Sequence, residues 1–171
     1  MDVYKPRSLR NTGYAVYVQP GKELALHGIW LSGLIYIGHA YRPERRGPLI
    51  DRYSGSCSFR RTLGALLKEE LGLTAVPSGR GRTNRDFVNY CFTFDSEMRL
   101  TRWIEENLDV APEALGDDLG LGDKRGAIHS KEPVLCLAGW QNPHLAKLQA
   151  LRRICADEAR AAKAKGRTSK P

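Results

Sequence analysis

Two tyrosines and the arginines that follow them are the side chains in this sequence best suited to chemistry on an anion. Tyr14 and Tyr36 each lie in a short β-branched and aromatic run, and Gly38 after the second run permits close approach of a neighbouring segment. Guanidinium groups bind phosphate in a planar, two-pronged geometry. The arginines between residues 42 and 61 are Arg42, Arg45, Arg46, Arg52, Arg60 and Arg61. This pattern indicates a surface that handles phosphate.

A second group of arginines follows in a glycine-rich loop. The loop contains Arg80, Arg82 and Arg85 together with Gly79 and Gly81. A flexible basic loop suits contact with a nucleic-acid backbone, while an ordinary solvated loop explains the same residues equally well.

The charge balance also favours a polyanionic partner. The 171 residues include 27 Lys and Arg against 19 Asp and Glu, a formal net charge of +8. Such an excess attracts nucleic acid, although many basic proteins bind nothing specific. Residues 105–123 reverse the balance, with seven acids and no Lys or Arg, which would repel phosphate or attract a cation.

Length and composition exclude several classes of protein. A chain of 171 residues has the size of one domain, and its longest apolar runs are too short to span a membrane. The N-terminus lacks the basic and apolar regions of a signal peptide, so we expect a cytoplasmic protein. The four cysteines have no zinc-ligand spacing and are expected to be buried, reduced thiols.

The elements nearest the tyrosines are predicted from periodicity. Residues 14–18 and 34–38 are predicted strands, residues 22–31 a third extended piece, and Ser32-Gly33 a tight turn before the second tyrosine strand. Apolar residues at spacings of three and four predict a helix over 59–71, with Ser58 as its cap and Gly72 at its end.

The second half of the chain is predicted to be mainly helical. Alternation over 87–94 predicts the strongest strand, and a helix from Asp95 or Ser96 to about 108 follows it. Residues 109–122 give a weaker signal. After Asn142 and Pro143 a long helix is predicted, whose buried face would comprise Leu145, Leu148, Leu151, Ile154 and Cys155.

These elements predict an α+β fold: a small three-stranded antiparallel sheet flanked by helices, with a long C-terminal helix. We expect one domain over residues 1–162. The basic residues 163–171 would form a flexible tail.

Two short motifs resemble those that name the GIY-YIG nuclease superfamily. Tyr36-Ile37-Gly38 matches the second motif in full, and Thr12-Gly13-Tyr14 matches the first at its tyrosine. Gly28-Ile29-Trp30 is the alternative first motif. The run from Ser58 to Leu67 resembles a bacterial branch of this superfamily. The resemblance extends from about residue 12 to about residue 160.

The resemblance implies an endonuclease that hydrolyses DNA phosphodiester bonds. Tyr14 would take a proton from the attacking water, and Tyr36 would support its geometry. Arg46 stands at the family's spacing for a phosphate-binding arginine, and Arg52 is the competing candidate. His39 would act as a proton relay or phosphate donor, with an exposed surface histidine as the alternative.

The resemblance also implies a divalent cation, Mg²⁺ or Mn²⁺, held by a glutamate. Counting back from Pro133 places Lys124 at that glutamate position, and Cys136 takes the place of a family asparagine. Asp123 is the candidate metal ligand and Glu132 a weaker one. If neither holds a cation, the site has no metal.

The expected partner is nucleic acid, specifically DNA, and no membrane. One alternative is a catalytically degenerate module that binds nucleic acid without cutting it. Another is a protein-interaction domain that uses the acidic 105–123 segment and the basic tail. The sequence does not indicate an oligomeric state. The expected nucleic-acid contacts are Arg60, Arg61, Arg80, Arg82 and Arg85.

Overall fold

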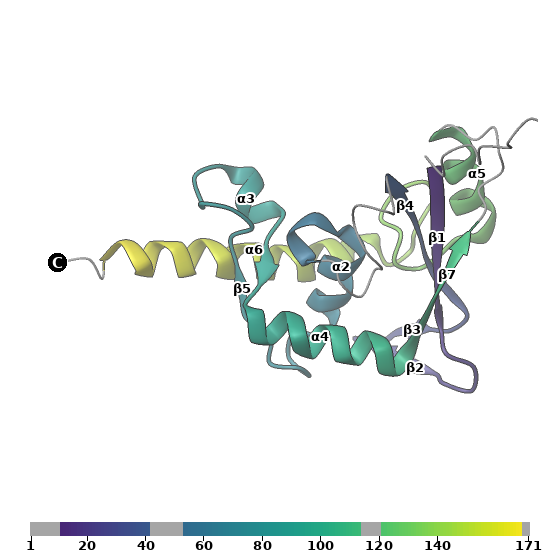
Figure 1. Cartoon of the computed structure of the whole chain (residues 1–171), viewed down its shortest axis with the longest axis horizontal. Helices are drawn as coiled ribbons and strands as arrows, with labels where there is room; N and C mark the ends of the chain where they lie inside the picture. Colours follow the sequence, from purple (N-terminus) through teal and green to yellow (C-terminus); the bar gives the residue numbers. More distant parts are fainter. Residues whose placement is uncertain (1–10, 42–52, 114–120, 169–171) are drawn as a thin grey trace, which may run out of the picture.

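A three-stranded antiparallel sheet stands at one end of the molecule (Figure 1). The computed structural model describes residues 11–41, 53–113 and 121–168. Within them the sheet has the order β4-β1-β7, with β1 at Asn11–Val18, β4 at Leu34–Tyr41 and β7 at Leu108–Glu113. The predicted α+β class and the sheet size are confirmed.

The pairing of β1 with β4 places the two motif tyrosines on the same face of the sheet. Tyr14 is opposite Gly38, and Val16 is opposite Tyr36. Residues that face each other in antiparallel strands share a face, as do residues two apart in one strand. Both predicted tyrosine strands are therefore confirmed.

Residues 22–31 form a hairpin rather than one extended piece. Strands β2 (Leu24–Leu26) and β3 (Ile29–Leu31) pair with each other in a separate small sheet. The turn residues His27 and Gly28 both have positive φ, 51° and 73°, as a two-residue hairpin turn of this hand requires. Gly33, with φ of 56°, forms part of the predicted turn before β4.

The predicted helix over 59–71 is present but shorter. Helix α2 spans Ser58–Leu66 and begins after Cys57, so Ser58 is its first residue and not its cap. Turns continue to Gly72, whose φ of 59° is the left-handed conformation that ends the segment. Phe59, Leu63 and Leu66 lie in the core, as the periodicity predicted.

The prediction of the strongest strand over residues 87–94 is wrong. Helix α3 (Asn84–Val88) takes its first part, and only Cys91–Phe92 remains as strand β6, paired with β5 (Ala75–Val76). The capping box between Thr83 and Asp86 starts this helix, so local capping outweighs the alternating pattern. Val88 and Phe94, which the alternation would place on one face with the buried Tyr90 and Phe92, are 45% and 78% exposed.

Helix α4 (Phe94–Asn107) begins at Phe94, one residue before the predicted start, and buries Leu100, Trp103 and Ile104. The chain then enters β7 directly. The third strand of the sheet therefore comes mainly from the 109–122 segment, for which the residue pattern predicted no definite element.

The last two helices lie on different parts of the fold. Helix α5 (Leu121–Lys131) packs beside β4, whereas α6 (Leu145–Thr168) extends along the molecule away from the sheet. In α6, Leu148 and Cys155 are buried as predicted, but Ile154 is 55% exposed because the buried stripe continues through Ala156 and Ala159. The helix reaches Thr168, past the predicted start of the tail.

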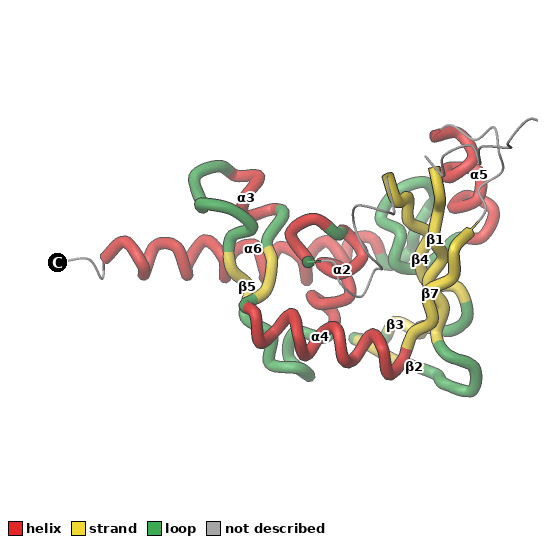
Figure 2. The backbone as a smooth tube through the Cα atoms, in the orientation of Figure 1, coloured by secondary structure: helices red, strands yellow, loops and turns green. Residues whose placement is uncertain are grey.

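Figure 2 shows α2 between the sheet and the small β5–β6 unit, with α6 behind it. Contacts of α6 with α2 and with β5 join these parts. No described helix is both long and apolar enough to cross a bilayer. All four cysteines are free and buried.

The outer edge of β4 is covered by the segment that follows α5. The backbone N–H of Leu135 donates to the carbonyl oxygen of Ile35 at 2.9 Å. Next to it, the Ile37 N–H donates to the Cys136 thiol at 3.4 Å, and that thiol donates to the Ile37 carbonyl oxygen at 3.6 Å.

Candidate functional site

Tyr14 and Tyr36 form a pair on one face of the sheet. Their ring centroids are 6.0 Å apart, and the Tyr36 ring also packs on Phe59 of α2 at 5.0 Å. The Tyr14 ring lies over Gly38: a Cβ at that position would be 2.0 Å from Tyr14 Cζ. Gly38 is therefore required by the position of Tyr14, as the sequence suggested.

Tyr36 is held in its protonated form. Burial, followed by the nearby Cys57 and Cys136 thiols, raises the pKa of Tyr36 well above its ordinary value, against a hydrogen bond with Tyr14 and the charge of Arg61. A phenol in this state donates a hydrogen bond at neutral pH and does not act as a base.

Arg61 is the described arginine whose charge acts on Tyr36. The residue is 8% exposed, and its Nη1 donates to the carbonyl oxygens of Ser54 at 2.8 Å and Gly55 at 2.9 Å. These acceptors belong to the short helix η2 (Ser54–Ser56). Burial, and secondarily the charge of Arg152, lowers the pKa of Arg61.

Arg60 occupies a different environment, which does not suit the expected contact with nucleic acid. Its side chain is fully buried, and Nη2 donates to Glu97 Oε2 at 2.8 Å and to Thr101 Oγ1 at 3.0 Å. The guanidinium is engaged in a buried ion pair between α2 and α4, so we leave Arg60 out of the proposed interface.

The loop arginines Arg80, Arg82 and Arg85 are all exposed, as contact with a nucleic-acid backbone requires. Arg85 lies in the first turn of α3, and the other two precede that helix. Their role in binding stays a prediction.

Several of the predicted site residues fall outside what the structure describes. Arg46 and Arg52 lie in the undescribed 42–52 segment. The backbones of His39 and Asp123 belong to β4 and α5, but their side chains are not described. The proposed roles of these four residues stay predictions.

The described donors near the tyrosine pair do not fit a divalent cation. The Cys136 thiol, whose charge state acts on Tyr36, is itself influenced by the positive charge of Lys124 rather than by a carboxylate. Burial raises the pKa of Cys136, which keeps it a neutral thiol rather than a thiolate ligand. Over residues 11–41, 53–113 and 121–168, no three His, Cys, Asp or Glu side chains that are described gather as a metal site would require.

The structure also separates the two candidate first motifs. Tyr14 pairs with β4 and contacts Tyr36, whereas Gly28-Ile29-Trp30 lies in the β2–β3 hairpin and Trp30 is 64% exposed. The structure therefore brings Tyr14, and not Trp30, to the second motif.

Comparison with known families agrees with this arrangement. The sequence profile of the GIY-YIG catalytic domain matches residues 30–154, more than half of the chain. The chain therefore belongs to the GIY-YIG nuclease superfamily, and its function is nuclease-like at that level. Nucleases of this superfamily act on DNA and generally need a divalent metal. The matched segment begins after β1, so Tyr14 is placed by the structure rather than by the profile.

Neither the curated proteins nor the solved structures give a match to this chain.

Two residues that matter around Arg60 and Arg61 were missed by the sequence reasoning. Glu97 lies inside a predicted helix, and nothing in its spacing indicates Arg60 as its partner. Asn89 was placed in the predicted strand over 87–94. The Thr83-x-x-Asp86 capping pattern would have indicated α3 and the position of Asn89 at its end.

Proposed function

We propose that this chain is an endonuclease-type phosphodiesterase that acts on DNA at the Tyr14–Tyr36 face of the sheet. The observation that carries the proposal is the contact of the two motif tyrosines over Gly38, in a chain that belongs to a nuclease superfamily. The net charge of +8 supports an anionic substrate.

Each tyrosine has a distinct role in this proposal. Tyr36 stays protonated and donates a hydrogen bond, which orients a phosphate oxygen or the attacking water. Tyr14 accepts the proton of that water. A phenol has an ordinary pKa of about 10, so nearby positive charge is needed for this role at neutral pH.

Arginines supply that charge and hold the phosphate. Among the described arginines, Arg61 is the one whose charge acts on the tyrosine pair, where it partly opposes the rise that burial causes in the pKa of Tyr36. Arg46 or Arg52 would bind the phosphate through a two-pronged contact. His39 would relay a proton or donate to the phosphate.

We assign no step to a divalent cation, because the described donors do not fit one. Asp123 is the candidate ligand that the assay below tests.

A second candidate function is DNA binding without cleavage. Lys124 favours it, because an ammonium group beside the Cys136 thiol attracts phosphate but cannot ligate a cation.

Nicking of supercoiled plasmid tests the proposal, with Mg²⁺, with Mn²⁺ and with a chelator. We expect the wild type to nick, and Tyr14→Phe to lower the rate by about 10²-fold or more, the typical contribution of a general base. Tyr17→Phe is the matched control, since the unbroken pairing of β1 with β7 places Tyr17 on the face of the sheet opposite to Tyr14. Asp123→Asn would abolish the response to metal if Asp123 is the ligand.

Binding assays decide what an inactive protein means. Loss of nicking with retained, salt-dependent DNA binding supports the second function, because each phosphate contact adds about 0.9 to the slope of log affinity against log salt. Loss of both would overturn the two DNA functions and leave the protein-interaction domain.

A further inference from the structure

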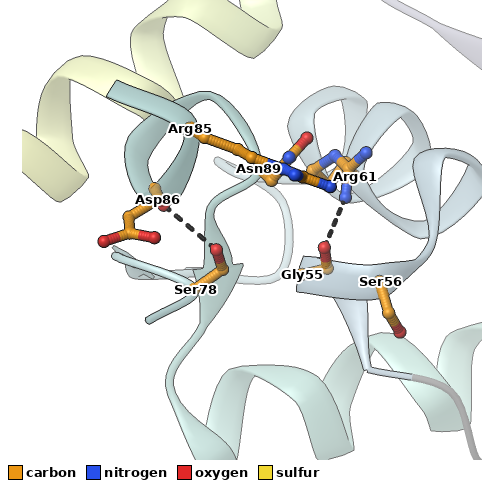
Figure 3. A pocket seen from close by; sticks show the side chains of 7 residues that line it. All are labelled: Gly55, Ser56, Arg61, Ser78, Arg85, Asp86 and Asn89. Atoms are coloured by element: carbon orange, nitrogen blue, oxygen red, sulfur yellow. Dashed lines mark hydrogen bonds between the residues drawn. The ribbon is translucent and has the colours of Figure 1, made fainter. Parts of the chain in front are cut away.

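A polar cavity of about 430 Å³ lies between η2, α2 and α3 (Figure 3). Arg61 contributes to it from α2, and Arg85 and Asn89 contribute from α3 and its end. None of the residues that line it is one of the two motif tyrosines. The cavity is thus a separate place on the molecule, connected to the tyrosine pair through Arg61.

Two guanidinium groups meet in this cavity. The Arg85 side chain extends toward Arg61 in Figure 3. No described carboxylate forms an ion pair with either arginine, in contrast to the pairing of Arg60 with Glu97. The site therefore holds two positive charges whose natural complement is an anion with several oxygens.

Arg61 is fixed in place but not saturated. Its two hydrogen bonds to Ser54 and Gly55 are both donated by Nη1, and its buried Nε has no acceptor among the described residues. Burial, and secondarily the charge of Arg152, lowers the pKa of Arg61, because the buried guanidinium has lost part of its hydration. An oxyanion would offset that disadvantage.

The wall that carries these acceptors is rigid. A Cβ at Gly55 would lie 2.6 Å from the Tyr53 ring and 2.9 Å from Ser78 Cβ, so the backbone is in close contact there. Tyr53 also donates from its hydroxyl to the Ser78 carbonyl oxygen at 3.2 Å. Arg61 is thus held in a site formed before any ligand arrives.

Asp86 is the lining carboxylate that could attract the two guanidinium groups, and one of its oxygens, Oδ2, is already engaged by backbone donors. Oδ2 accepts the backbone N–H of Arg82 at 2.9 Å and that of Thr83 at 3.3 Å, and these bonds lower the pKa of Asp86. Its carboxylate points away from both guanidinium groups (Figure 3). Asp86 therefore shapes α3 rather than neutralising the cavity.

We propose that this cavity is an oxyanion site that binds a phosphate group between Arg61 and Arg85, with the Asn89 amide as a further donor. The proposal goes beyond hydrolysis at the tyrosine pair and does not depend on it. The phosphate can belong to a free or terminal monoester or to a backbone diester, since both present oxygens to the two guanidiniums.

The test is titration of the full chain with inorganic phosphate at low salt, followed by the NMR signals of the arginine Nε–H groups and the Asn89 amide. We expect saturable shifts at Arg61, Arg85 and Asn89. Arg85→Gln should weaken phosphate binding at least tenfold. Arg102→Gln, an exposed arginine of α4 outside the cavity, should change it less than twofold.

Arg85 is exposed, so its substitution should leave the thermal unfolding midpoint unchanged. Equal phosphate affinity in wild type and Arg85→Gln would overturn the proposal. It would also be overturned if neither inorganic phosphate nor a diester shifted the signals of Arg61 and Arg85 in the wild type.

A second titration, with a dinucleoside monophosphate that carries only a diester, identifies the source of the phosphate. Binding of both probes, or of either one with loss in Arg85→Gln, supports the site and names the form it prefers. Binding of neither overturns it. Because Tyr14→Phe should retain phosphate binding, failure of the nuclease proposal and failure of this one are distinguishable.

Discussion

Arg60 and Arg61 are neighbours in α2 but lie in two different regions of the molecule. Arg60 faces α4, where Glu97 and Thr101 accept its hydrogen bonds and no surface is left to solvent. Arg61 faces η2 and α3, where its acceptors are backbone carbonyl oxygens and where Arg85 lines the same cavity. The charge of Arg60 is therefore balanced by a carboxylate, whereas no described carboxylate forms an ion pair with Arg61.

The difference teaches that a count of arginines does not identify a binding surface. What separates a structural arginine from a ligand-binding one is whether the fold supplies its counter-ion. A buried guanidinium without a carboxylate destabilises the fold, because its charge has lost hydration and gained no counter-ion. Its presence in this fold therefore points to a bound anionic ligand.

The largest expected effect on stability comes from breaking the ion pair between Arg60 and Glu97. Glu97→Gln removes the charge that pairs with Arg60 and weakens acceptors used by the Ser54 and Phe92 backbone N–H groups. We expect a loss of about 3–5 kcal/mol in the free energy of unfolding, measured by urea denaturation. Glu105→Gln, exposed on the same helix, should change it by less than about 0.5 kcal/mol. A loss below about 1 kcal/mol for Glu97→Gln would remove the contrast between the two arginines.

Alkaline pH should lower the free energy of unfolding by an intermediate amount, through the buried tyrosines Tyr36 and Tyr90 near Arg61. Burial raises the pKa of both Tyr36 and Tyr90, against the charge of Arg61. An unfolded tyrosine ionises near pH 10, so above that pH the unfolded chain loses protons that the folded chain keeps, and stability falls as pH rises.

At pH 11 the expected loss relative to pH 9 is about 1.4 kcal/mol for each of these tyrosines. Tyr36→Phe should reduce the total loss by the contribution of one tyrosine. Unfolding curves at the two pH values measure it. An unchanged pH dependence in Tyr36→Phe would show that Tyr36 ionises in the folded protein.

The smallest expected effect on stability comes from removing the N-terminal cap of α3, the helix that carries Arg85. Thr83→Ala removes the side-chain cap that Thr83 provides to the Asp86 N–H. We expect a loss of about 1 kcal/mol and faster amide exchange over residues 84–88. Phosphate affinity should fall less than in Arg85→Gln, since Arg85 is loosened but present. Thr74→Ala, exposed and outside any helix, is the control, and equal exchange in the two variants would contradict the role of the cap.

Local sequence patterns correctly predicted those helices and strands that are specified by their own residues rather than by distant contacts. The apolar spacing of α2 and α4 and the β-branched runs of β1 and β4 were sufficient for their identity. The 87–94 alternation failed because the Thr83–Asp86 cap competes with it. Strand β7 was not predicted, since its stability comes from pairing with β1, a contact between distant parts of the chain.

The site was predictable only as far as its motifs reach. Tyr36, Gly38 and the role of glycine beneath Tyr14 follow from the sequence, whereas the partners of Arg60 and Arg61 depend on how α2 meets α4 and η2. Charge and spacing treat the two arginines alike, and the tertiary contacts distinguish them.

The Cys136 thiol covers part of the outer edge of β4 and so limits further strand pairing there. Cys136 occupies both hydrogen-bonding groups of Ile37, where a further strand would otherwise attach. Because the sulfur engages both groups, Ile37 offers neither a free donor nor a free acceptor to another molecule at this edge.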